Sequence, residues 1–234
     1  MDVVIMAAGE GRRLRPLTER WAKPILPIDG RAVIAVLLRE LAAAGLTRVT
    51  VVTGHLAEQV EALVANGSGF GIEAHFVRQP EPDGSADAVR RGLAGGATPP
   101  ALLVAADTVF ASGTIARFAT AWGNAGTAGA LAYRHGLEPT PSKAGVRLVD
   151  GLIREVYDLD PSLAFTSAPL WALGPELAPF LERVPGPPYE LKDAYQQAID
   201  AGLRISGIEV GPTRDLTRPE DLMVQNFAYL PLEP

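Results

Sequence analysis

The feature that most constrains the fold is a regular alternation of short β-branched runs with longer segments of helical spacing. The short runs cover Val3–Met6, Arg48–Thr53 and Leu102–Ala105, and the longer segments cover Ala32–Ala44, Ala57–Ala65, Ala86–Leu93 and Ile115–Trp122. Strands that alternate with helices are typical of βαβ units, in which ligands bind beyond the carboxyl ends of the strands. The pattern predicts an α/β fold with a mostly parallel central sheet flanked by helices.

Composition limits the possible partners and compartments. The 234 residues contain no repeat and no linker-like stretch, so we expect a single domain over residues 1–234. A net charge of −6 argues against nucleic acid or an anionic membrane as the main partner. The chain has no cysteine and no apolar run of the ~18 residues that a membrane helix needs. No basic region precedes the first apolar strand, and we expect a cytoplasmic protein.

A basic loop follows the first predicted strand. Gly9 and Gly11 open it, and it holds five of the 21 basic residues of the chain, namely Arg12, Arg13, Arg15, Arg20 and Lys23. Glycine allows backbone N–H groups to cradle phosphate oxygens, and arginine adds planar forks that match them. An ordinary loop with solvated arginines is the alternative, because the third glycine of a dinucleotide fingerprint is missing. The charge of the loop favours a polyanion site.

The loop segment Met6–Thr18, together with Trp21–Pro27, resembles the signature of the sugar nucleotidyltransferases. Within that family it is most similar to the glucose-1-phosphate thymidylyltransferases and their uridylyl relatives. The resemblance implies a Rossmann-like nucleotide-diphospho-sugar transferase domain. It further implies Mg²⁺-dependent transfer of a nucleotidyl group, from UTP or dTTP by preference, to a sugar 1-phosphate or similar acceptor with release of pyrophosphate.

A second motif, Gln79–Ala88, follows an expected strand over Ile72–Val77. Its glutamine amide offers a donor beside an acceptor, which complements N3–H and O4 of uracil or thymine. The alternative is a proline-rich turn in which Asp83 or Ser85 caps the next helix. The motif resembles the base-reading loop of the thymidylyltransferases, which assigns Gln79 and Gly84 to the base.

Two aspartates are candidate metal ligands. Asp107 ends a fully apolar run, where an unpaired carboxylate is costly to bury. Asp215 precedes a predicted Thr217-to-Glu220 capping box, which accounts for the helix start without it. The resemblance implies that Asp107 and Asp215 hold Mg²⁺, a cation that prefers oxygen ligands.

The resemblance also implies the phosphate contacts. Arg13 and the backbone N–H groups of the glycine loop would hold the β- and γ-phosphates, while Lys23 would bridge the α-phosphate and the incoming acceptor phosphate. Asp107 would act in catalysis with these two cations. The expected nucleotide-binding residues of the loop are Ala8, Gly9, Gly11, Arg12 and Arg13.

The acceptor side departs from the family pattern. Lys23, Gly145 and Asp158 are the expected acceptor-binding residues, but the stretch Val156–Asp158 lacks the lysine that relatives use for the sugar phosphate. We therefore expect a different acceptor from glucose 1-phosphate, or another cation in its place. The candidates are Lys143, Arg147 and Lys192, and Trp171 is either a packing residue or part of the acceptor pocket.

Two other functions stay open at this point. A nucleotide-binding regulator could keep the triphosphate loop and lose the acceptor site, which would explain the missing lysine. A glycosyltransferase of related fold would hold its metal with an Asp-x-Asp such as Asp158-Leu-Asp160, but this motif does not follow an apolar strand end.

Overall fold

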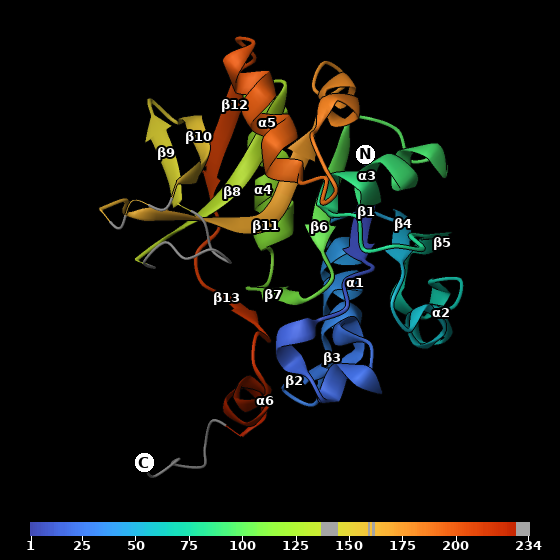
Figure 1. The fold of residues 1–234 in the computed structure, drawn as a ribbon. Helices are drawn as coiled ribbons and strands as arrows, with labels where there is room; N and C mark the ends of the chain where they lie inside the picture. Colours follow the sequence, from blue (N-terminus) through green and yellow to red (C-terminus); the bar gives the residue numbers. More distant parts are fainter. Residues whose placement is uncertain (137–144, 159, 161, 228–234) are drawn as a thin grey trace.

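The computed structural model describes residues 1–136, 145–158, 160 and 162–227 of the chain. One nine-stranded sheet runs through it in the order β5-β4-β1-β6-β11-β8-β12-β10-β9 (Figure 1). In that order the strands span Glu73–Arg78, Arg48–Thr53, Asp2–Ala7, Ala101–Ala105, Phe165–Leu173, Gly129–His135, Ile205–Glu209, Leu152–Asp158 and Gly145–Val149.

Helices cover both faces of the sheet and make this an α/β fold. The buried side chains of α1, α2 and α4 form one core cluster with Val3 and Ile5, whereas those of α3 and α5 form another with Val4. Strand β1 is thus buried on both faces, which explains its continuous apolar run. These helices span Val33–Ala43, Ala57–Val64, Thr114–Ala125, Ser85–Ala94 and Leu191–Asp200. Within the described residues, no helix is long and apolar enough to cross a membrane.

The expectation of a mostly parallel sheet is not confirmed. Parallel pairing joins β5, β4, β1 and β6, as the βαβ pattern predicts, and also joins β8 to β12. Strand β11 is inserted antiparallel between β6 and β8, and β10 pairs antiparallel with both of its neighbours. The sheet is therefore mixed. The alternation of strands and helices applies to the first half of the chain only.

Two short antiparallel pairs lie outside this sheet. β2 (Pro27–Ile28) pairs with β3 (Arg31–Ala32), and β7 (Thr108–Phe110) pairs with β13 (Thr213–Asp215). The last helix, α6 (Pro219–Asn226), follows β13 and lies near β2 and β3 (Figure 1). Five short 3-10 helices complete the described part: η1 Arg12–Leu14, η2 Leu17–Glu19, η3 Lys23–Ile25, η4 Ser68–Phe70 and η5 Ala178–Arg183.

The start of α3 depends on a glycine rather than on a side-chain cap. Gly84 has φ of 106°, and a Cβ atom there would lie 2.3 Å from the carbonyl oxygen of Tyr189. Ser85 does not cap the helix, because its hydroxyl donates to Glu190 and accepts from the backbone N–H of Leu191 at the start of α5. Close backbone contact between the two helix starts therefore explains Gly84.

Replacing Gly84 tests this contact. We expect Gly84→Ala to lower the free energy of unfolding by about 2–4 kcal/mol, because it adds backbone strain and a clash with Tyr189. Gly96→Ala is the matched control, since Gly96 has φ of 110° and nothing within 4 Å of an added Cβ. Denaturant unfolding should show a larger loss for Gly84→Ala. Equal losses would contradict a role for the contact.

Candidate active site

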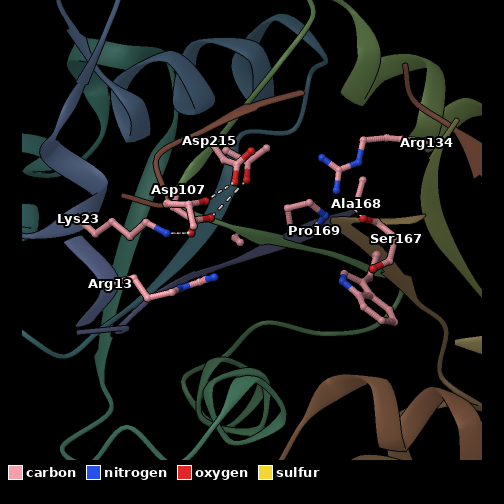
Figure 2. A pocket seen from close by; sticks show the side chains of 12 residues that line it. Arg13, Lys23, Asp107, Arg134, Ser167, Ala168, Pro169 and Asp215 are labelled. Atoms are coloured by element: carbon pink, nitrogen blue, oxygen red, sulfur yellow. Dashed lines mark hydrogen bonds and ion pairs between the residues drawn. The ribbon is translucent and has the colours of Figure 1, made fainter. Parts of the chain in front are cut away.

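A cavity of about 240 Å³ lies beyond the carboxyl ends of β1 and β6 and reaches over β11. Figure 2 shows Arg13, Lys23, Asp107 and Asp215 on one side of it and Arg134 on the other. The lining residues come from both halves of the chain and are Arg13, Lys23, Ala105, Asp107, Thr108, Arg134, Ser167, Ala168, Pro169, Trp171, Asp215 and Thr217. Four of the expected catalytic and metal-binding residues, Arg13, Lys23, Asp107 and Asp215, are brought together here.

The glycine loop holds a fixed turn beside this cavity. Gly11 has φ of 63°, which favours glycine, and its carbonyl accepts a 2.9 Å hydrogen bond from the buried hydroxyl of Thr18. The carbonyl of Thr18 in turn accepts one from Nε2 of His55 at 2.6 Å. The turn is therefore tied to the neighbouring loop after β4.

The two consecutive arginines of the loop point in different directions. Arg13 lines the cavity, whereas the side chain of Arg12 is exposed and donates to Glu10 at 2.6 Å. That hydrogen bond lowers the pKa of Glu10. Arg12, an expected nucleotide-binding residue, therefore does not line the cavity in this structure.

Lys23 and Asp107 form an ion pair in the cavity wall. Lys23 Nζ donates to Asp107 Oδ2, and the side chains are 15% and 31% exposed. The hydroxyl of Thr108 lies 3.3 Å from the other carboxylate oxygen. Lys23 was expected to contact phosphate and Asp107 to contact a metal ion. In this partly buried site the two side chains neutralise each other instead.

Asp215 reaches the cavity through the pairing of β13 with β7, in which it lies opposite Thr108. Its Oδ2 accepts a 3.0 Å hydrogen bond from the hydroxyl of Thr217. The predicted capping box from Thr217 to Glu220 is wrong. The helix starts one residue later, and Asp221 accepts from the backbone N–H groups of Thr217 and Arg218 at 2.6 and 2.8 Å. The side chain of Thr217 contacts Asp215 instead.

The donor set of the cavity fits a magnesium ion. Asp107 and Asp215 offer carboxylate oxygens from adjacent chain segments, and no group of three or more metal-binding side chains occurs among the described residues. Mg²⁺ commonly takes one or two protein carboxylates and completes its shell with phosphate oxygens and water. These two residues could hold the ion only together with an oxygen-rich ligand.

A second cavity of about 280 Å³ shares Ala105 with the first. Its lining includes the glycine loop and the start of α3, with Met6, Ala8, Gly9, Gln79, Pro82, Gly84, Ser85, Ala88, Ala105 and Glu190. An added Cβ on Gly9 would meet nothing within 4 Å. The two expected base contacts, Gln79 and Gly84, are thus brought to the side of the loop away from Asp215.

The amide of Gln79 is oriented by its protein partners. Its Nε2 donates to the carbonyl of Gly84 at 3.1 Å and to Asp87 Oδ2 at 2.8 Å. Burial tends to raise the pKa of Asp87, but hydrogen bonds from Arg91 and Gln79 outweigh it and lower the pKa, so this partner stays ionised. Both amide protons are therefore used within the protein. Gln79 offers a ligand its Oε1 acceptor, not the donor–acceptor pair that the sequence suggested.

Of the expected acceptor residues, Lys23 lines the first cavity, whereas Gly145 lies in the sheet. Gly145 is buried and pairs with Asp158 and Thr166 in the sheet. Gly145 is not among the described residues that line the two cavities. Lys143 lies outside the described residues. Trp171 does line the first cavity, and its ring also packs edge-on against Tyr195.

An irregularity in β11 shapes the floor of the cavity. The pairing of β11 with β8 shifts between Ser167 and Trp171. Proline lacks the N–H group that a sheet ladder requires, so Pro169 suits such a bulge. The bulge lines the cavity together with Arg134 of β8, a residue that the sequence reasoning missed. A single charge near the end of the apolar run Gly129–Tyr133 could have indicated it, as Asp107 was indicated.

Comparison with known proteins places the chain in a family. The model of the family "Nucleotidyl transferase" matches residues 2–141, which include the glycine loop, Lys23, Gln79 and Asp107.

The chain belongs to the nucleotidyl transferase family.

Similarity to individual proteins covers part of the chain when sequences are compared and the whole chain when structures are compared. A glucose-1-phosphate thymidylyltransferase of Streptomyces griseus is 36% identical over 89 residues, 38% of this chain and 25% of that protein. An N-acetylmuramate alpha-1-phosphate uridylyltransferase of Neisseria meningitidis is 37% identical over 36% of each chain. A solved Bacillus anthracis protein assigned as a glucose-1-phosphate thymidylyltransferase superposes with a TM-score of 0.85 at 18% identity, over 100% of this chain and 97% of that one. This nucleotidyl transferase chain therefore shares the fold of that protein over its whole length.

A double-mutant cycle measures the ion pair of this nucleotidyl transferase site. We expect Lys23→Met and Asp107→Asn to show a coupling of about 1–2 kcal/mol in the free energy of unfolding, because the pair is partly buried. The exposed pair Arg147–Glu155 is the control, with side chains 46% and 49% exposed. Its coupling should stay below about 1 kcal/mol and fall with added salt. Additive effects of the two cavity mutations would show that the contact is energetically irrelevant.

Proposed function

We propose that the protein transfers a nucleotidyl group from a nucleoside triphosphate to a sugar 1-phosphate or similar phosphorylated acceptor and releases pyrophosphate. The observation that carries the proposal is the convergence of Arg13, Lys23, Asp107 and Asp215 on one cavity at the carboxyl edge of the sheet. Sheets of this kind bind ligands at that edge. The family and the thymidylyl and uridylyl relatives support the same reaction class.

The triphosphate would lie along the glycine loop. Backbone N–H groups of the loop and the Arg13 guanidinium would hold the β- and γ-phosphates, and Lys23 would leave Asp107 to contact the α-phosphate. The acceptor phosphate attacks the α-phosphorus in line, a new phosphorus–oxygen bond forms, and the bond to the pyrophosphate leaving group breaks. A phosphate monoester has a second pKa of about 6, so it attacks ionised and needs no general base.

Asp107 and Asp215 would hold Mg²⁺ in this reaction. When bound, the ion supplies positive charge to the phosphate oxygens. The protein's own contribution is to position the reacting phosphates and neutralise their charge with Lys23 and Arg13, which is the main source of catalysis in phosphoryl transfer.

The base would enter the second cavity. There the Oε1 acceptor of Gln79 can take a hydrogen bond from N3–H of uracil or thymine, whereas N3 of cytosine carries no proton. Cytosine offers only its exocyclic N4 amine as a donor, one position along the base edge, so an acceptor aligned with N3 favours UTP or dTTP over CTP.

Pyrophosphate release tests the reaction. With Mg²⁺, a nucleoside triphosphate and a panel of sugar 1-phosphates, we expect release that needs both substrates and stops when EDTA is added. Asp107→Asn and Asp215→Asn should each reduce the rate at least ~100-fold, because each removes charge from the transition-state environment. Asp200→Asn, at the exposed end of α5, is the matched control and should retain the wild-type rate. Nucleotide binding without release from any pair would indicate a binding protein and refute the transfer reaction.

Substitution of Gln79 tests the base contact. We expect Gln79→Met to raise the KM for UTP and dTTP by roughly tenfold and to reduce their advantage over CTP, because N3–H loses its acceptor in a dry pocket. The kcat at saturating nucleotide should change much less. Competition between the triphosphates in one reaction, with products separated by chromatography, measures the preference directly. An unchanged preference would place the base elsewhere.

A further inference from the structure

A buried arginine faces the first cavity from the side opposite the phosphate loop. Arg134 lies near the end of β8, is 4% exposed, and lines the cavity. Figure 2 shows its guanidinium across the cavity from Lys23 and Arg13, with Ala168 and Pro169 of the β11 bulge between them. It therefore lies on the part of the cavity that the nucleotide loop does not reach.

The hydrogen-bond partners of Arg134 within the protein are neutral. One terminal nitrogen donates to the hydroxyl of Thr213, and the other donates to the carbonyl of Ser167 at 2.6 Å. Its Nε is buried with no hydrogen-bond partner. Among the residues that the structure describes, no carboxylate forms an ion pair with it. A buried charge whose hydrogen-bond partners are all neutral is expensive to maintain, so the site suits an anionic ligand.

The charge of this arginine persists despite burial. Burial lowers the pKa of Arg134, and the negative charge of Asp215 partly opposes that shift. An arginine remains protonated at any pH at which the fold is stable. Arg134 lines the same cavity as Asp107 and Asp215, the carboxylates proposed for the metal, where the reacting phosphates would meet.

Two of the other cations considered for the acceptor, Arg147 and Lys192, are described in the structure and have partners elsewhere. Arg147 donates to Glu155 at 2.8 Å and Lys192 to Asp193 at 3.1 Å, and neither is among the described residues of the lining. Arg134 is thus the basic residue that the described lining offers on the side of β8 and β11.

We propose that Arg134 binds the phosphate group of the acceptor and takes the place of the lysine that this chain lacks after Val156. This inference rests on the proposed function. While one acceptor oxygen attacks beside Lys23, the other two face away from the nucleotide and need neutralisation. The guanidinium keeps unused N–H protons in a planar fork, which suits two oxygens of one phosphate. The carbonyl of Ser167 and the hydroxyl of Thr213 hold that fork in place.

The first test measures binding without turnover. The arginine Nε–H signals of ¹⁵N-labelled protein are recorded by NMR with Mg²⁺ and a non-hydrolysable UTP analogue, and the Arg134 signal is identified by its loss in Arg134→Lys. Glucose 1-phosphate and inorganic phosphate should each shift this signal, whereas glucose should not. This result does not require catalysis, so it separates a failure of the arginine site from a failure of the transfer reaction. No shift with either phosphate would overturn the proposal.

The second test uses kinetics with the acceptor selected by the pyrophosphate assay. Arg134→Met should raise the KM for that acceptor at least about tenfold, while the KM for the nucleotide stays within about twofold, because only one substrate loses a charged contact. Arg134→Lys keeps the charge but loses the planar pair of N–H donors. Its KM for the acceptor should lie between those of the wild type and Arg134→Met. Arg117→Met on the exposed face of α4 is the control and should match the wild type.

The remaining outcomes decide against a phosphate contact. A similar rise in both KM values, with an unshifted Nε–H signal, would show a structural role only. A rise confined to acceptors that carry an additional carboxylate would assign Arg134 to that group instead. If both variants fail to fold, the Arg134 Nε–H signal is assigned in the wild-type protein by sequential triple-resonance NMR, and its titration still decides.

Discussion

The short antiparallel pair of β7 and β13 holds the candidate site together. It sets Asp215 opposite Thr108 and therefore beside Asp107, although the two aspartates come from distant parts of the chain. The next residue, Leu216, is buried in a small cluster with Leu26, Ile28, Val33 and Leu14, the last of which lies in the turn that follows Gly11. Three residue pairs of sheet thus fix the carboxylates and support the loop. A shift of this pairing by one residue would exchange the faces of Asp215 and Leu216. Asp215 would then leave the cavity, and Leu216 would leave its buried cluster.

Charge balance is the second constraint on the site. The first cavity gathers the cations Arg13, Lys23 and Arg134 with the carboxylates Asp107 and Asp215. The ion pair of Lys23 with Asp107 reduces the repulsion within each set when no ligand is present. A ligand with phosphate groups would offer Lys23 a stronger ionic contact, and a bound divalent cation would do the same for Asp107. The ion pair therefore compensates Lys23 and Asp107, whereas the hydrogen-bond partners of Arg134 are neutral.

Much of the fold and site could be predicted because the signals are local in sequence. The strands at β1, β4 and β6 and the helices α1 to α4 follow from apolar spacing, and the loop residues follow from a contiguous motif. The antiparallel insertion of β11 could not be predicted, since strand pairing between distant segments leaves no periodic signal. Arg134 was missed for the same reason: its partners Ser167 and Thr213 come from two later strands. The capping residue lies one position later than predicted, because Asp221 and not Glu220 accepts from the backbone N–H groups of Thr217 and Arg218.

The anchored amide of Gln79 has a consequence for how such a site could change its choice of base. Its Nε2 is held by a carbonyl and by the Asp87 carboxylate, which can only accept, so the amide cannot turn over without losing both hydrogen bonds. Asp87, which lies behind the pocket wall, thus determines that Gln79 presents its oxygen to the pocket. If Gln79 reads the base as proposed, a donor at position 87 would help to hold the reversed amide, and a substitution behind the pocket would change which base is preferred.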